Sequence, residues 1–260
     1  GGGLYAGRIA STFGPVDHVS TDASACASSL KVLMDVYNLV TNYGFTRVIV
    51  LSGEDAVNNL SLEFFGEAGA SIQADQDMQP SAFDGKNQGF YLGQGAVLSV
   101  FETEPTTKPL AKFLGAYSAA EDNTNPLGQR DDGAGYSKAI EGALWVAKTP
   151  ADSVYMVKTH GTGTPVNNAA EKTALTRTLP EFIATSYKPR IGHTMGASGL
   201  LETGLMLKDI ESGIVPAIPN RTGSDDVFVS ADTPVQGDKF ISLAAGMGNI
   251  YSAALFSVGV

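Results

Sequence analysis

The chain has 260 residues, of which 43% are apolar and 17% charged. With a mean hydropathy of +0.02, this composition is typical of a packed globular protein with one large core or two small ones, and it excludes intrinsic disorder as the main state. The formal net charge of −10, without any run of basic residues, argues against nucleic acid as a partner. The single cysteine, Cys26, cannot form an internal disulfide, so the fold requires no oxidising compartment.

The two ends of the chain indicate neither a secretory signal nor a membrane span. The start lacks a basic segment followed by an apolar one, and its three glycines are typical of a fragment end. Residues 240–260 carry no charge, but their glycines and polar residues predict two short strands around a Gly-rich turn rather than a spanning helix. We therefore expect a cytoplasmic location.

The first predicted elements are a strand, a helix and a second strand. The strand covers residues 16–20, and the helix covers residues 25–43, where apolar side chains recur at helical spacing until Gly44 ends it. Residues 47–51 form a largely apolar run of the kind that makes buried strands in layered α/β proteins.

The same alternation continues along the chain, so the predicted class is α/β. Further strands are predicted over residues 92–102, 110–118, 153–158, 242–245 and 252–258, and further helices over residues 136–148, 168–179 and 199–212. Residues 121–135, rich in Pro, Asn and Asp, are the longest irregular stretch; a plain connector is favoured over a loop beside a functional site.

The lone cysteine lies in a turn of small residues before the first predicted helix. In the segment Asp-Ala-Ser-Ala-Cys-Ala-Ser-Ser, residues 22–29, Cys26 would face the positive end of the helix dipole, which lowers the pKa of a thiol. The small neighbours leave room for a substrate carbonyl. Taken alone, this segment fits a buried structural cysteine better than a nucleophile.

Two of the three histidines lie in similar turns. His160 follows a predicted strand in the segment Lys-Thr-His-Gly-Thr-Gly-Thr-Pro, residues 158–165, at the strand end where active-site loops of α/β folds gather. His193 lies in Gly-His-Thr-Met-Gly-Ala-Ser-Gly, residues 192–199, which leads into a helix. Taken alone, each histidine fits a residue held by local hydrogen bonds as well as it fits a catalytic residue. The three turns together favour a catalytic set.

These three turns, in this order, resemble the Cys-His-His set of the β-ketoacyl synthases, the condensing enzymes of fatty-acid and polyketide synthesis. A lysine five residues before the second histidine, Lys188, belongs to the same pattern. Lesser matches are Phe83-Asp84 with residues 89–96, and the Gly-Met-Gly turn at residues 246–248. The resemblance covers nearly the whole chain.

The resemblance implies a thiolase-like fold of five αβαβα layers, made of two related halves. Cys26 lies much nearer the start than in the family, so most of the first half is expected to be absent from this chain. Residues 1–118 would be the remainder of the amino-terminal half, with the nucleophile, and residues 119–260 the carboxy-terminal half, with both histidines. Because the absent strands would leave a sheet edge unpaired, we expect a homodimer or a heterocomplex.

The resemblance also assigns roles in the site. Cys26 would hold the acyl group, while His160 and His193 would donate hydrogen bonds to the malonyl thioester oxygen as it becomes an enolate. Lys188 and Glu171 would form a supporting ion pair beside the second histidine.

Further residues would bind the substrates. Thr162 and Thr164 would bind the pantetheine arm, and the backbone N–H groups of Cys26 and Met247, next to Gly248, would form an oxyanion hole. The sequence departs from the family at Gln94, Asn168 and Asn249, where Glu, Asp and Gly are usual, which bears on the acyl pocket and its gating loop.

The predicted activity is decarboxylative Claisen condensation of an acyl thioester with a malonyl thioester, the reaction of a 3-oxoacyl-[acyl-carrier-protein] synthase. No metal or bound cofactor is expected, since phosphopantetheine would arrive on an acyl carrier protein or coenzyme A. An acidic carrier would need a basic patch on this acidic chain, for which the candidates are Lys31, Arg47, Lys86 and Arg190.

Two other functions compete with condensation. An inactive homologue could act as a structural or chain-length partner subunit; the short amino-terminal part and the substitutions favour it, and the retained Cys26, His160, His193 and Lys188 oppose it. A cysteine hydrolase with Cys26 and one histidine is weaker, because it does not explain the second Gly-His turn.

Overall fold

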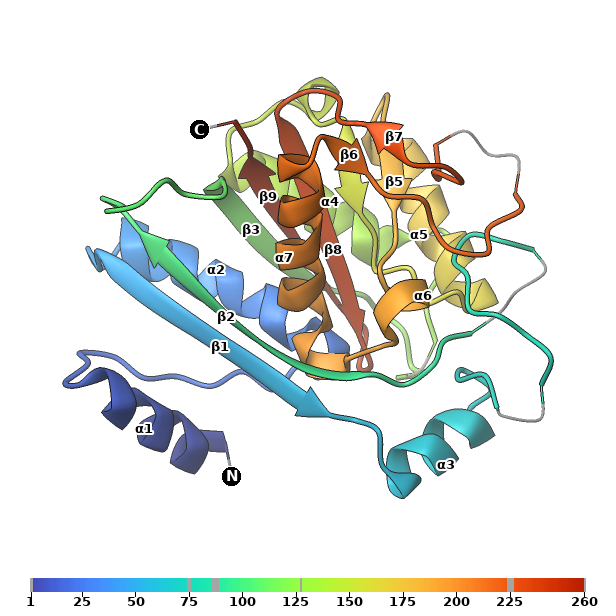
Figure 1. Cartoon of the computed structure of the whole chain (residues 1–260), viewed down its shortest axis with the longest axis horizontal. Helices are drawn as coiled ribbons and strands as arrows, with labels where there is room; N and C mark the ends of the chain where they lie inside the picture. The colour runs from blue at the N-terminus through green and yellow to red at the C-terminus, as the bar shows by residue number, and fades with distance from the viewer. Residues whose placement is uncertain (1, 74–75, 86–88, 127, 224–226, 260) are drawn as a thin grey trace.

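The fold contains two main sheets (Figure 1), seen in a computed structural model that describes all residues except 1, 74–75, 86–88, 127, 224–226 and 260. The larger sheet has the strand order β3–β9–β8–β4–β5, where β8, β4 and β5 run parallel and β9 is antiparallel to both its neighbours. Its strands are β3 (Lys112–Ala120), β4 (Met156–Lys158), β5 (Ile183–Thr185), β8 (Lys239–Gly246) and β9 (Ile250–Ser257). The smaller sheet pairs β1 (Arg47–Asp55) with β2 (Gln94–Glu102) in antiparallel fashion. A short ladder joins β6 (Ile214–Val215) to β7 (Thr233–Pro234).

Two helices lie between the sheets and two others cover the far face of the larger sheet. The central pair is α2 (Ser28–Thr41) and α7 (Ser198–Glu211), whose apolar stripes share one core cluster with Val50 of β1 and Phe240 of β8. The outer pair is α4 (Ala134–Val146) and α5 (Pro165–Thr178), which pack against each other and share a second core cluster with alternate residues of β8 and β9. The larger sheet is therefore buried on both faces.

The smaller sheet is buried on one face only, so the expectation of a fully buried strand at residues 47–51 was wrong. Val48 and Val50 face the core cluster around α2. The intervening Ile49 and Leu51 point outward and pair with Val100 and Leu98 of β2. These four apolar side chains are 37%, 44%, 50% and 47% exposed, respectively.

Most of the other predicted elements are confirmed within a few residues. The helix predicted at residues 25–43 is a 3-10 turn, η1 (Ala25–Ala27), followed by α2, and the uncharged end of the chain is the β8–β9 hairpin. The strand predicted at residues 16–20 was wrong: residues 14–24 form no helix or strand and pair with neither sheet. Residues 121–126 and 128–133 are irregular, as expected.

Several short elements were not predicted. They are α1 (Gly2–Phe13), α3 (Asn59–Glu67), α6 (Lys188–Ile191), η2 (Ala151–Ser153), η3 (Met195–Ala197), β5, β6 and β7. For α3 a local signal was present, because the Asn58 side chain caps the helix by accepting a hydrogen bond from the Ser61 N–H at 3.0 Å.

The expected division at residue 118 falls inside β3, which pairs with β9 of the larger sheet. The two-half organisation stays a prediction. Within the described part of the chain, no helix has both the length and the apolar character needed to cross a bilayer.

Candidate active site

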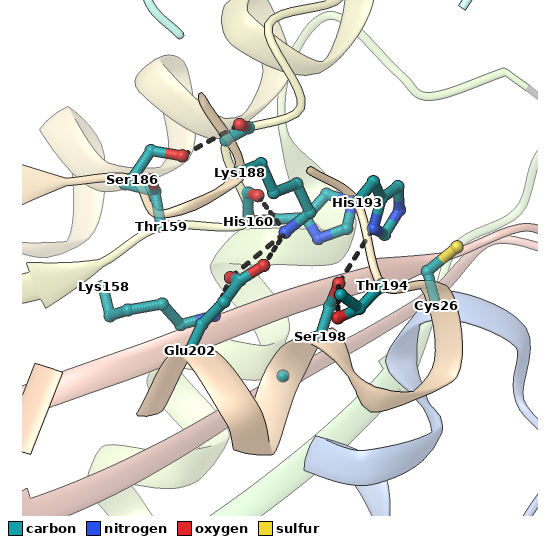
Figure 2. A network of polar contacts seen from close by, with 12 residues as sticks. Cys26, Lys158, Thr159, His160, Ser186, Lys188, His193, Thr194, Ser198 and Glu202 are labelled. Atoms are coloured by element: carbon teal, nitrogen blue, oxygen red, sulfur yellow. Dashed lines mark hydrogen bonds and ion pairs between the residues drawn. The ribbon is translucent and has the colours of Figure 1, made fainter. Parts of the chain in front are cut away.

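The three turns singled out in the sequence meet beside the ends of α2, β4 and α7 (Figure 2). Cys26 is the middle residue of η1 and is only 6% exposed. Its Sγ lies 3.7 Å from the Sδ of Met195, which begins the corresponding turn before α7. The nucleophile candidate is thus packed against the turn that carries the second histidine.

Burial decides the acidity of Cys26. Loss of water around the thiol raises its pKa to about 11, and the opposing influence of the Lys188 ammonium is smaller. The pKa lowering expected from the helix dipole was therefore wrong, because a partial charge at a helix end does not offset the desolvation of a thiolate. Cys26 rests as a neutral thiol at pH 7.

The two histidines lie side by side, with ring centroids 5.6 Å apart. Burial lowers the pKa of both imidazoles well below the usual range, and the Lys188 ammonium lowers it further, so both rings are neutral at pH 7. His193 Nδ1 is 2.8 Å from Ser198 Oγ, and the Phe90 ring packs against the imidazole in a T-shaped arrangement with centroids 4.9 Å apart. A Ser198 hydroxyl that donates to Nδ1 places the His193 proton on Nε2. A neutral imidazole of this kind presents one N–H donor to a ligand.

Glu171 holds the His160 loop by its backbone. Its carboxylate accepts hydrogen bonds from the N–H groups of His160 at 2.6 Å and Gly161 at 2.9 Å, and from Asn167 Nδ2 at 3.0 Å. Burial still raises the pKa of Glu171, and these three hydrogen bonds oppose that rise. Glu171 thus belongs to the site as a support for the loop.

The expected Lys188–Glu171 ion pair was wrong, because the carboxylate that faces Lys188 belongs to Glu202 of α7. Lys188 Nζ lies 2.8 Å from Glu202 Oε1 and donates a further hydrogen bond, 2.5 Å long, to the main-chain carbonyl of His160. Both oxygens of Glu171 are already used by backbone N–H groups and by Asn167. A sequence signal for Glu202 existed: it is the one charged residue among those that α7 buries, the others being apolar, small or hydroxyl-bearing.

Lys158, at the end of β4, was also missed. Its side chain is fully buried, with Nζ 3.1 Å from Glu202 Oε2 and 2.7 Å from the carbonyl oxygen of Leu243. Lys158 ends an apolar run at residues 154–157; a lysine buried with such a run requires an acidic partner, and that was the available signal.

The remaining predicted site residues lie around the same loops. Thr162 and Thr164 are joined through their hydroxyl groups at 3.0 Å. The turn after β8 lies directly against the Cys26 turn, since a Cβ on Gly246 would be 2.5 Å from the Ser24 carbonyl oxygen. Met247 and Gly248 follow in the turn between β8 and β9.

The structure also gives the surroundings of the three positions that depart from the family pattern. Asn168 Nδ2 donates to the carbonyl of Gly163 at 3.4 Å. Asn249 has a φ of +62°, a conformation that glycine and asparagine tolerate best, and its side chain donates to the carbonyl of Asn123 at 2.7 Å. Gln94 opens β2 opposite Asp55.

Of the candidates for a basic patch, two have acidic partners. Lys31 pairs with Asp22 and Arg47 with Glu102. Arg190 donates to the carbonyl of Ala217, and Lys86 lies outside the described residues.

Two family models match the chain in succession. The β-ketoacyl synthase amino-terminal domain matches residues 2–106, and the β-ketoacyl synthase carboxy-terminal domain matches residues 110–222. Together they cover most of the sequence.

The curated relatives of the chain include ketoacyl synthases. The ketoacyl synthase alpha subunit of the tetracenomycin polyketide synthase of Streptomyces glaucescens is 28% identical over 264 residues, covering 94% of this chain and 60% of the relative. The 3-oxoacyl-[acyl-carrier-protein] synthase 2 of Synechocystis sp. is 29% identical over 233 residues, covering 85% of this chain and 56% of the relative. The chain thus spans somewhat over half the length of these relatives.

Solved structures establish the fold. A type II polyketide ketosynthase, solved in complex with its acyl carrier protein, matches with a TM-score of 0.89 at 21% identity, over 98% of this chain and 66% of the other. A β-ketoacyl synthase of Burkholderia phymatum STM815 matches with a TM-score of 0.84 at 23% identity, over 92% of this chain and 61% of the other. The predicted thiolase-like fold is therefore confirmed, and with both domain models matched the chain belongs to the β-ketoacyl synthase family.

Proposed function

We propose that this chain carries the condensing site of a ketosynthase, which joins an acyl thioester to a malonyl thioester with loss of carbon dioxide. The observation that carries the proposal is the pair of buried, neutral imidazoles, 5.6 Å apart, in a site that also holds the only cysteine. A single histidine would serve a cysteine hydrolase, whereas two neutral donors suit a developing enolate oxygen.

The first step transfers the acyl group to Cys26. The sulfur attacks the thioester carbonyl, a new C–S bond forms, and the bond to the carrier thiol breaks. The Cys26 proton ends on the departing thiol. Because the resting thiol has a pKa of about 11, we expect its proton to leave as attack proceeds rather than beforehand. The N–H groups of Cys26 and Met247 are the proposed donors to the tetrahedral oxyanion.

The second step breaks the bond between the malonyl α-carbon and its carboxylate, which releases carbon dioxide and leaves an enolate. We assign the Nε2–H groups of His160 and His193 as donors to the enolate oxygen. The loss of one such donor typically costs about 3–4 kcal/mol. The enolate carbon then attacks the acyl carbon, a C–C bond forms, and the Cys26 thiolate leaves and regains a proton.

The substrates and partners follow from the family. We propose that Thr162 and Thr164 contact the pantetheine arm of an acyl carrier protein or coenzyme A, that the chain acts as a homodimer or heterocomplex, and that it works in the cytoplasm. One solved relative is a ketosynthase with its carrier protein, and another is the ishigamide ketosynthase/chain length factor, with a TM-score of 0.80.

A second candidate is a non-condensing partner subunit. The substitutions at Asn168 and Asn249, and the likeness to a ketosynthase/chain length factor pair, favour it. The two candidates differ in whether Cys26 becomes acylated.

The test is acylation followed by decarboxylation. After incubation with an acyl thioester, the peptide with residues 22–30 should gain one acyl mass, and Cys26→Ala should remove the gain. An unchanged mass in the folded protein would favour the partner-subunit function.

The histidine variants test the second step. His160→Ala and His193→Ala should still accept the acyl group but lose malonyl decarboxylation by about a hundredfold or more each. Variants that decarboxylate normally and fail to acylate would reverse the proposed roles.

A further inference from the structure

Lys158 is a charged side chain inside the core that the steps above leave without a role. It ends β4, between β5 and β8, and its side chain has no exposed surface. Removal of an ammonium from water costs several kcal/mol, so such a group persists only where partners compensate for the lost hydration. Burial lowers the pKa of Lys158, and the Glu202 carboxylate opposes this shift.

A continuous chain of contacts joins Lys158 to the first catalytic histidine (Figure 2). Lys158 lies beside Glu202 and donates to its Oε2. It also donates to the carbonyl of Leu243, which belongs to β8. The same carboxylate accepts from Lys188, and Lys188 in turn donates to the His160 carbonyl. Two ammonium groups thus share one carboxylate directly behind the His160 loop.

The position of Glu202 depends on both lysines. Lys188 contacts both carboxylate oxygens, at 2.8 and 3.2 Å, while Lys158 contacts only Oε2. Lys158 is itself held by the β8 backbone, so it anchors the carboxylate to the sheet. Without Lys158, the ion pair between Glu202 and Lys188 would remain, but its connection to the β8 backbone would be lost.

We propose, on the basis of the condensing function above, that Lys158 is a positioning residue. It fixes Glu202, and through Lys188 the His160 loop, and it places a second positive charge behind the two imidazoles. A positive charge there stabilises the negative charge that develops on the enolate oxygen and disfavours protonation of either ring.

The charged surroundings of the imidazoles support this role. They comprise Lys158 of β4, Glu171 of α5, Lys188 of α6 and Glu202 of α7, with the Cys26 thiol from η1 and, beyond it, Glu54 of β1. After burial and Lys188, the Lys158 charge also lowers the pKa of both His160 and His193. Loss of that charge should therefore raise the pKa of both rings.

The experiment is an NMR titration of histidine-labelled protein, since the chain has only three histidines. Lys158→Gln removes the charge but keeps an N–H donor for Glu202, and Lys158→Arg keeps the charge. In Lys158→Gln both His160 and His193 should titrate about one pH unit higher than in the wild type. Lys31→Met, which removes a surface charge, should shift the titration of neither site ring.

A kinetic measurement gives the second readout. In Lys158→Gln the kcat for malonyl decarboxylation should fall about tenfold with little change in KM, and the low-pH limb of the pH–rate profile should move to higher pH. In Lys158→Arg that limb should stay where it is in the wild type.

Unchanged titration of His160 and His193 in Lys158→Gln would overturn the proposal. If this variant does not fold, Lys158→Met is the second neutral variant and carries the same expectation. A wild type without decarboxylase activity would contradict the proposed function, whereas the titration would still test Lys158.

Discussion

The helices that follow Cys26 and His193 begin with closely similar backbones. Each unit has a 3-10 turn of three residues and an α-helix of 14 residues, η1–α2 and η3–α7. Ala25 and Met195, the first residues of the two turns, have φ values of +50° and +44°, which residues other than glycine rarely adopt. The same strained turn is thus used twice.

The side chains on the two turns differ. After the strained residue, the first turn has Cys26 and the second has Gly196. Ser28 Oγ stays within its own turn, since it donates to the Ala25 carbonyl at 2.6 Å and accepts from the Ser24 N–H at 2.8 Å. Ser198 Oγ instead contacts His193 Nδ1. A shared backbone therefore carries the proposed nucleophile in one place and the hydroxyl partner of His193 in the other.

The largest expected contrast between the turns is the pH dependence of Cys26 reactivity. Because burial raises the thiol pKa to about 11, its alkylation by iodoacetamide should rise about tenfold per pH unit between roughly pH 7 and 10. Decarboxylation, which depends on imidazoles that stay neutral, should change little from about pH 8 down to 6. The chain has one cysteine, so mass spectrometry of the alkylated protein reports this site alone. An alkylation rate that levels off below about pH 8 would contradict this and indicate a stabilised thiolate.

A smaller contrast is expected from the matched serines. Ser198→Ala leaves His193 Nδ1 without its partner, which should slow decarboxylation by about 1–3 kcal/mol, or roughly 5- to 150-fold, and leave acylation intact. Ser28→Ala should do the reverse, because it loosens only the Cys26 turn. Separate assays of the two half-reactions measure both effects. Equal losses in both assays from either variant would show that the turns do not act independently.

A third effect, no larger than the second, concerns stability where the two helices cross. A Cβ on Gly199 would be 2.8 Å from the Cβ of Leu30, whereas a Cβ on Gly204, in the same helix, meets nothing within 4 Å. Gly204→Ala should stabilise the fold by up to about 1 kcal/mol, the gain in helix propensity. Gly199→Ala should be less stable than Gly204→Ala by about 1–3 kcal/mol because of the close contact. Urea unfolding measures both, and equal stability of the two variants would mean that α2 and α7 can separate without cost.

Local residue order was enough to predict most of the longer helices and strands, whereas the layered fold was predicted from the family resemblance. The apolar spacing before Gly44 predicted α2, and the uncharged end with its glycines predicted the β8–β9 hairpin. The small-residue turns around Cys26, His160 and His193 predicted the site, because short-range sterics and helix starts depend on neighbouring residues. The strand predicted at residues 16–20 failed because a strand also needs a partner, which propensity does not supply.

The tertiary structure alone decided which charges meet and how acidic the reactive groups are. Lys158 and Glu202 are 44 positions apart in the sequence, yet their side chains lie 3.1 Å apart, while Glu171, the partner expected for Lys188, binds backbone N–H groups instead. The Cys26 pKa likewise rises because residues distant in sequence remove water from the thiol. Ion pairs and desolvation depend on distances through space, and those distances exist only once the chain has folded.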